Sequence, residues 1–239
     1  FEGPHAVNKR IAMRNGLFME SRQRLCLNRL RCTVFTSLCL VLTGHPSVEY
    51  LSESRPFKSM SSSYLGAPHA FTLPDIKTTM FAEFYGAMLG DGCIYTAGDS
   101  LCIVGNLVLD RWYVEEYLQT VCKKLFNITP RIYLRPNDGS IAMVINSKHI
   151  TAFFCELGFP RGKKMKAKLT IPSFFFKNKK LLAACIRGIF DTDGCIWPHS
   201  HTRGMLDITA KKHTLLESIK KALLQLELRF GHSKNNVVC

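Results

Sequence analysis

The sequence contains no Cys-x-x-Cys pair and no cysteines and histidines at zinc-finger spacing, although it has ten cysteines. A structural zinc site is therefore not expected. Ten cysteines spread over 239 residues also differ from the dense framework of a small secreted disulfide protein. We expect buried thiols in an intracellular, reducing compartment, either the cytoplasm of a prokaryote or an organelle, and no secretion.

A long apolar run is also missing. The mostly apolar stretch at residues 32–43 is far shorter than the roughly 20 residues that a membrane-spanning helix needs, so we expect no membrane partner. Arginines precede this stretch, as they would in a signal peptide starting at Met19. A buried helix or strand is the more frequent explanation for so short a run.

Acidic residues are few, because 18 Asp and Glu stand against 32 Lys and Arg, which gives a net charge of +14. This balance favours a polyanionic partner, such as nucleic acid or an anionic membrane surface. Charge alone leaves open a soluble basic protein whose lysines only keep it dispersed. The 46% of hydrophobic residues are enough to build a core, which excludes disorder throughout the chain.

Composition divides the chain at a segment rich in serine and proline. Six of the twelve residues at 52–63 are serine, and Pro68 and Pro74 follow. We therefore predict a linker over residues 52–75 and an N-terminal segment of unknown role over residues 1–51. Because the chain begins at Phe1, we expect a fragment or an in-frame fusion.

After the linker, hydrophobic periodicity predicts a regular order of helix, two strands, helix, two strands and helix. The expected helices are residues 77–89, 109–125 and 149–157, the last of them ended by Gly158. The expected strands are residues 93–95, 101–104, 131–134 and 141–146, and an Asn137-Asp138-Gly139 turn joins the last two.

An internal repeat is the most informative feature. Residues 82–95 align without gaps with residues 184–197 at an offset of 102, and six of the fourteen positions are identical. Glycine inside a helix costs about 1 kcal/mol relative to alanine, so we expect both helices to use the room for close packing. Small residues recur every fourth position and form one stripe on each helix: Ala82, Gly86 and Gly90, and Ala184, Gly188 and Thr192.

Each repeated helix ends at Asp-Gly, which puts Asp91 and Asp193 at the negative ends of two helix dipoles. If the helices pack side by side in parallel, the two carboxylates approach each other, and a divalent cation would relieve their repulsion. A single Asp-Gly is usually only a turn that ends a helix. Two copies in matched helices favour a metal site.

These residues resemble the LAGLIDADG family of homing endonucleases and maturases, with residues 84–92 and 186–194 as the two copies of the nine-residue motif. The first copy departs from the motif at Leu89 and Gly90. The resemblance covers about residues 76–239. It implies an α/β saddle of two pseudo-symmetric α-β-β-α-β-β-α halves, residues 76–180 and 181–239, whose antiparallel sheets lie in the DNA major groove.

The resemblance also implies the site residues. Asp91 and Asp193, with Gly90 and Thr192 beside them, would hold Mg²⁺ or Mn²⁺ at the scissile phosphates of the two strands. Members of the family commonly have a lysine near the reacting water. Lys164 is the first candidate for this lysine, and Lys148, Lys211 and Lys212 are the others.

Contacts to DNA are expected from two groups of residues. Arg131, Tyr133 and Arg135 alternate on one predicted strand and would read bases, together with Ser140, Met143 and Asn146 on the partner strand. Eight basic residues between positions 161 and 180, with no acid among them, favour phosphate contacts. The residues expected to bind DNA in this way are Lys163, Lys166 and Lys168, with Lys148, Lys211 and Lys212.

The expected function is site-specific, Mg²⁺-dependent cleavage of double-stranded DNA with a long recognition site, by a protein that a mobile intron or intein encodes. The alternatives are a maturase that binds intron RNA, a non-cleaving nucleic-acid-binding protein, and an inactive remnant of a mobile element. The presence of both Asp91 and Asp193 favours the enzyme. No splicing-domain blocks are recognisable.

The second half is expected to be truncated, because only 45 residues follow Gly194. A strand near residues 205–209 and a helix over residues 214–228 are predicted. The chain should then stop before the hairpin and the last helix that complete the first half. We expect a monomer, unless a second chain completes this half.

Overall fold

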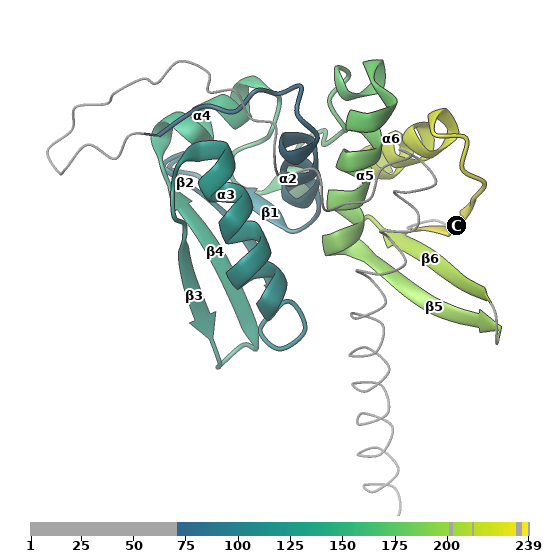
Figure 1. Cartoon of the computed structure of the whole chain (residues 1–239), viewed down its shortest axis with the longest axis horizontal. Coiled ribbons are helices and arrows are strands. Elements are labelled where there is room, and N and C mark those ends of the chain that lie inside the picture. The colour runs from purple at the N-terminus through teal and green to yellow at the C-terminus, as the bar shows by residue number, and fades with distance from the viewer. Residues whose placement is uncertain (1–70, 201–202, 212, 233–235, 239) are drawn as a thin grey trace, which may run out of the picture.

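The structure is a computed structural model that describes residues 71–200, 203–211, 213–232 and 236–238. It contains two α/β halves, each with a four-stranded antiparallel sheet. Helices α2 (Thr79–Gly90) and α5 (Lys179–Asp193) pack against each other between the two sheets (Figure 1). The expected α/β fold of two pseudo-symmetric halves is confirmed.

The first half follows the predicted order of elements. Its sheet has the strand order β1-β2-β4-β3, and every neighbouring pair is antiparallel. After α2 the elements are β1 (Gly92–Ile94), β2 (Ser100–Asn106), the π-helical turn η2 (Tyr113–Leu118), α3 (Gln119–Phe126), β3 (Arg131–Arg135), β4 (Ser140–Asn146) and α4 (Lys148–Glu156).

The second half repeats this sheet, with the strand order β5-β6-β8-β7. After α5 its elements are β5 (Gly194–Ser200), β6 (Arg203–Thr209), α6 (His213–Gln225), β7 (Gly231–His232) and β8 (Asn236–Val238). The expectation that this half stops before its hairpin is wrong, because β8 pairs with β6 as β4 pairs with β2. Strands of two and three residues are too short to produce a hydrophobic period, so the sequence does not reveal them.

Polar side chains set the starts of the three helices that position the site. Each accepts a hydrogen bond from a backbone N–H of the first turn, which would otherwise have no partner within the helix. Thr78 accepts from Phe81 (3.2 Å) at α2, Ser147 from Ile150 (3.3 Å) at α4, and Asn178 from Lys180 (2.9 Å) at α5.

The helix predicted over residues 109–125 starts later than expected. The Asn106 side chain accepts hydrogen bonds from the N–H groups of Val108 (2.9 Å) and Leu109 (3.0 Å) and holds a turn there. Such a side chain offers the backbone an alternative to the helix. The helical segment then contains the wide turn η2 before α3 begins.

The two faces of the first sheet differ. Leu101, Ile103, Ile141, Met143 and Ile145 belong to the main core, which also contains buried residues of α2 and α5. The expectation that Met143 faces DNA is therefore wrong: its side chain is fully buried, with its sulfur 3.5 Å from the Cys122 sulfur. The other face carries Arg131, Tyr133 and Arg135, whose register partners are Val144, Ala142 and Ser140.

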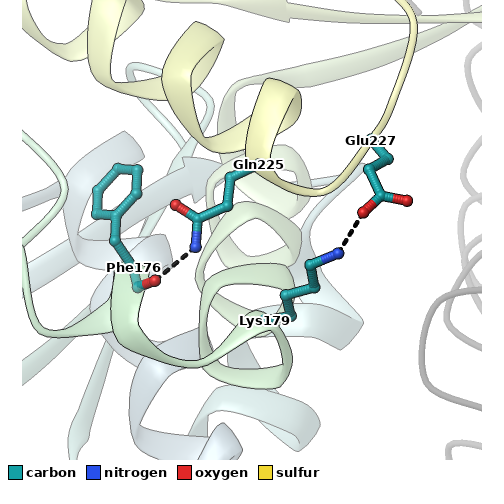
Figure 2. Close-up of polar contacts among 4 residues, drawn as sticks. All are labelled: Phe176, Lys179, Gln225 and Glu227. Atoms are coloured by element: carbon teal, nitrogen blue, oxygen red, sulfur yellow. Dashed lines mark hydrogen bonds and ion pairs between the residues drawn. The ribbon is translucent and has the colours of Figure 1, made fainter.

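Polar contacts hold the end of α6 against the segment that precedes α5 (Figure 2). Gln225 Nε2 donates to the carbonyl oxygen of Phe176 (2.5 Å), and Lys179 Nζ pairs with Glu227 Oε1 (2.5 Å). At the other end of α6, Thr214 donates to the carbonyl oxygen of Leu169 (2.9 Å). The segment between α4 and α5 therefore packs against α6 of the second half.

Residues 71–75 lie within the predicted linker but contact the first half. Phe71 is buried and stacks on His149, and the Thr72 N–H donates to the carbonyl oxygen of Phe126 (2.9 Å). The predicted N-terminal segment, most of the predicted linker and the apolar stretch at residues 32–43 lie outside the described residues. In the part of the chain that is described, no helix is both long enough and apolar enough to span a membrane.

Candidate functional site

The two motif helices touch through their backbones at glycines. A Cβ at Gly86 would lie inside van der Waals contact with the carbonyl oxygen of Cys185, and a Cβ at Gly188 would do the same with the carbonyl oxygen of Glu83. Each contact is the image of the other under the 102-residue offset, because 86 maps to 188 and 83 maps to 185. The two helices are therefore related by a local pseudo-twofold axis at their crossing. Only glycine, which has no Cβ, permits so close an approach of the two backbones.

A third contact of this kind lies where the helices end. A Cβ at Gly90 would overlap the side chain of Thr192 and would lie 3.3 Å from Asp193 Oδ2. Thr192 Oγ1 turns back and donates to the carbonyl oxygens of Gly188 (3.2 Å) and Ile189 (3.0 Å). Ala82 and Ala184, the remaining members of the predicted stripes, are buried, and their neighbours Glu83 and Cys185 supply the carbonyls at the crossing.

The motif carboxylates lie at these adjoining helix ends. Asp91 caps α2, with its N–H donating to the carbonyl oxygen of Ala87 (3.2 Å), and Asp193 is the last residue of α5. Burial raises the pKa of Asp193 above its ordinary value, and the positive charges of Lys164 and Lys211 oppose this shift only in part. The fold thus holds the half-buried Asp193 carboxylate at the place where Asp91 ends α2.

A loop from α4 carries Lys164 to the same place. Gly158 ends α4 with a left-handed φ of +93°, and Gly162 adopts φ +71° while its N–H donates to the carbonyl oxygen of Ile94 (2.8 Å). Arg161 forms a parallel bridge with Ile94 along the edge of β1. The loop therefore follows β1 back towards the end of α2.

The Lys164 ammonium group sits on the C-terminal end of α2. Its Nζ donates to the carbonyl oxygen of Leu89 (3.1 Å) and to that of Gly90, which satisfies groups that the helix leaves without intrahelical donors. Burial lowers the pKa of Lys164, while Asp193 and Asp91 act in the opposite direction. One partly desolvated positive charge therefore faces both motif carboxylates.

The donors at the helix ends fit a hard divalent cation. Mg²⁺ is commonly held by one or two carboxylates, with waters and substrate phosphate oxygens completing its shell. Asp91 and Asp193 supply that number of carboxylates, and the glycine at position 90 lets the end of α5 that carries Asp193 approach α2 closely. Within the described ranges no cluster of three or more His, Cys, Asp or Glu side chains could hold a metal by itself.

The predicted DNA-binding residues occupy several places. Arg131, Tyr133 and Arg135 are exposed on the outer face of β3, and Lys163, Lys166 and Lys168 are exposed along the loop that carries Lys164. Lys211 is exposed, and its positive charge lowers the pKa of the Asp193 carboxyl group. Lys148 is exposed in the first turn of α4, and Lys212 lies outside the described residues.

A buried polar cluster beside the glycine crossing was not predicted from the sequence. Glu83, buried on α2, accepts a hydrogen bond from Tyr117 of η2 and forms an ion pair with Arg187 of α5. The wide turn of η2 is the element that presents Tyr117. The sequence does contain one indication of this cluster, which is the presence of Glu83 among the apolar residues of a motif helix. A buried carboxylate needs a positively charged or hydrogen-bond-donating partner.

Two cysteines next to the site also escaped the sequence analysis. Cys93 and Cys102 are direct register partners on β1 and β2, and their sulfurs are 3.2 Å apart. A hydrogen bond from Cys93 and another from Tyr95 lower the pKa of Cys102 to about 6, against the effect of burial. Only the pairing of the two strands, nine residues apart along the chain, brings these thiols together.

Paired helices that end in acidic residues, each followed by a four-stranded sheet, give the two halves a matched α/β architecture. Residues 180–231 match the family model of the LAGLIDADG-like domain. The resemblance to the LAGLIDADG family is therefore confirmed over residues 180–231, the part of the chain that the family model matches. No curated protein matches the chain.

Solved structures of two LAGLIDADG proteins are also similar to the chain. I-DmoI in complex with DNA and Ca is 19% identical, with a TM-score of 0.43 over 67% of this chain and 81% of that one. I-DmoI in complex with DNA and Mn is 18% identical, with a TM-score of 0.44 over 69% and 89%. The LAGLIDADG meganuclease I-AabMI bound to uncleaved DNA is 13% identical, with a TM-score of 0.39 over 65% and 76%.

Proposed function

We propose that the protein is a site-specific endonuclease that hydrolyses double-stranded DNA with divalent metal at the ends of α2 and α5. The observation that carries the proposal is the glycine-mediated crossing of the two helices, which puts the Asp193 carboxylate against Gly90, next to Asp91. Burial of Asp193 disfavours its ionised form, so the folded protein carries a free-energy cost for this negative charge. A bound cation would reduce that cost. The LAGLIDADG-like domain over residues 180–231 supports the same function.

The charge distribution supports DNA as the substrate. The chain carries +14, and the segment from residue 161 to residue 180 holds eight basic residues and no acid. Five of them, Arg161, Lys163, Lys164, Lys166 and Lys168, lie on the loop between α4 and α5, which runs beside β1 at Arg161. Arg131, Tyr133 and Arg135 form a polar row on the outer face of the first sheet, as direct readout of base edges requires.

The residues at the helix ends have separate tasks. A divalent cation bound there would supply Lewis-acid activation of a water and of the scissile phosphodiester. Asp91 and Asp193 would hold it and exclude other anions, while the glycine crossing keeps their spacing rigid. Lys164 Nζ, fixed by two carbonyl oxygens of α2, presents a positive charge to the negative charge that develops on the phosphate.

Selection from a DNA library tests the proposal. The full chain is incubated with randomised double-stranded DNA and Mg²⁺, and the new ends are captured and sequenced, with a parallel sample containing a chelator. We expect one long sequence to be enriched, cut on both strands, only in the sample with Mg²⁺. Binding without new ends in either sample would contradict the proposal and favour a maturase or another non-cleaving binding protein.

Replacing Lys164 by methionine should slow cleavage of the selected site by about 100-fold, because the positive charge near the reacting phosphate is lost. DNA affinity should change little, since a single charge among many phosphate contacts is removed. The matched control is Lys163→Met, which removes an exposed lysine one residue earlier. Equal cleavage rates for the two variants under saturating enzyme would show that Lys164 has no special role.

A further inference from the structure

Two thiols face each other on the sheet that begins at the first motif. Cys93 lies on β1, two residues after Asp91, and its direct cross-strand partner is Cys102 on β2. Their sulfurs are 3.2 Å apart, and both cysteines are free. Cys93 is half-buried, whereas Cys102 is buried in a small apolar cluster with Ala142 and Val144.

The geometry allows a bond between these sulfurs. Directly opposite residues of antiparallel strands have Cα atoms about 4.5–5.5 Å apart, within the range of disulfides. The two sulfurs, now 3.2 Å apart, need to approach by only about 1 Å to reach bonding distance. Small rotations about the two Cα–Cβ bonds can provide this approach while the strand pairing remains.

We propose that Cys93 and Cys102 form a reversible disulfide across β1 and β2 by exchange with a small-molecule disulfide. The sulfur of Cys93, the more accessible thiol, attacks the reagent and forms a mixed disulfide, and its proton leaves with the first released thiol. Cys102 then gives up its proton, and its thiolate attacks the Cys93 sulfur and displaces the second reagent thiolate, which takes up that proton. The two cysteines are oxidised, and one reagent disulfide is reduced to two thiols.

The environment of Cys102 suits the resolving role. The hydrogen bond between the two thiols lowers the pKa of Cys102 to about 6 and raises the pKa of Cys93, so the negative charge of the pair lies mainly on Cys102, which burial shields from bulky reagents. Attack on a sulfur already 3.2 Å away needs no access from solvent. The electrostatic effect of Lys164 acts in the same direction on Cys102.

The second half provides an internal comparison. Cys195 is the counterpart of Cys93 under the 102-residue offset, but its register partner on β6 is Asp207. A disulfide can therefore form between β1 and β2 of the first half. The matching pair in the second half, Cys195 and Asp207, cannot form one. Cys195 is also half-buried, so it is a matched control for the accessibility of Cys93.

The disulfide should act on catalysis, a consequence that rests on the proposed nuclease function. β1 begins directly after Asp91, so any movement of β1 that accompanies the bond reaches the end of α2. Displacements of about 1 Å at a catalytic group can cost about 100-fold in rate. We expect the oxidised protein to cleave the selected site at least about tenfold more slowly, and a dithiol reductant to restore the rate.

Peptide mapping tests the disulfide independently of cleavage. The full chain is treated with glutathione disulfide, free thiols are blocked, and the protein is digested with trypsin and then with a protease that cuts before aspartate. Trypsin releases residues 78–111, and cuts before Asp91, Asp99 and Asp110 separate Cys93 from Cys102. We expect the two fragments to stay joined until they are reduced, with a mass lower by two hydrogen atoms than the two free-thiol fragments together.

The variants make the result specific. Cys93→Ser should leave Cys102 without a bond, Cys102→Ser should leave Cys93 as a mixed disulfide with glutathione, and Cys195→Ser should behave like the wild type. Blocked thiols at both positions in the treated wild type, or a Cys93 bond to another cysteine, would overturn the proposal. A joined pair with unchanged cleavage would overturn its effect on catalysis, whereas a reduced protein that never cleaves would contradict only the nuclease function.

Discussion

Replacing Asp193 by asparagine is expected to slow cleavage of double-stranded DNA by about 1,000-fold, and Asp91→Asn should have an effect of the same size, because each removes several kcal/mol of metal-dependent transition-state stabilisation. Both variants should still bind the selected DNA, since the exposed arginines and lysines of the sheet and loop are unchanged. Single-turnover cleavage and a gel-shift titration on the same DNA measure the two effects separately. Cleavage by both variants at the wild-type rate would remove the motif carboxylates from the mechanism.

The same substitution should have the opposite effect on stability. The folded state raises the pKa of Asp193, so it binds that proton more tightly than the unfolded chain does. The ionised carboxylate therefore costs stability above the raised pKa, and the cost disappears as the pH falls through it. Metal-free Asp193→Asn should unfold at a higher urea concentration than the wild type at pH 7, with a smaller difference at acidic pH.

Asp191→Asn is the matched control for both readouts. Asp191 lies two residues before Asp193 on α5 and is also half-buried, but Asp193 is the carboxylate that lies against Gly90. Its replacement should leave most of the cleavage activity. A loss as large as that of Asp193→Asn would mean that the geometry at Gly90 does not distinguish the two carboxylates.

Replacing Gly188 by alanine is expected to lower the free energy of unfolding by about 3 kcal/mol. The new Cβ would overlap the carbonyl oxygen of Glu83 and lie 2.8 Å from the backbone nitrogen of Ala87. Both are backbone atoms of α2, so the overlap can be relieved only by moving the helices apart. Urea denaturation followed by circular dichroism measures the loss, and cleavage should fall with it because the helix ends separate.

The sign of this effect makes the test decisive. At an unconstrained helix position, Gly→Ala stabilises by about 1 kcal/mol. Gly231→Ala on β7 is the control, since nothing lies within 4 Å of a Cβ at that position, and its effect should stay within about 0.5 kcal/mol. A Gly188→Ala protein as stable as the wild type would show that α2 and α5 do not cross at these glycines.

Local chemistry explains why much of the fold could be predicted. Periodicity and turn residues located the elements of the first half, because amphipathic helices and an Asn-Asp-Gly turn have strong short-range signals. Gly158 illustrates the accuracy of such signals: it was expected to end a helix, and it does so with φ +93°. The strands β7 and β8 and the turn held by Asn106 were missed, since their formation depends on pairing and on a side-chain contact.

The sequence by itself determined the repeat: two helices with small residues at matched positions, each ending in Asp-Gly. That pattern is local, because helical spacing alone places the glycines and the aspartates on each helix. Only the tertiary structure decided which other residues join them. Lys164 reaches the carbonyl oxygen of Gly90 across 74 residues, and Cys93 meets Cys102 through strand pairing. Both contacts depend on how helices, loops and strands pack and pair, which the spacing of residues along the chain does not encode.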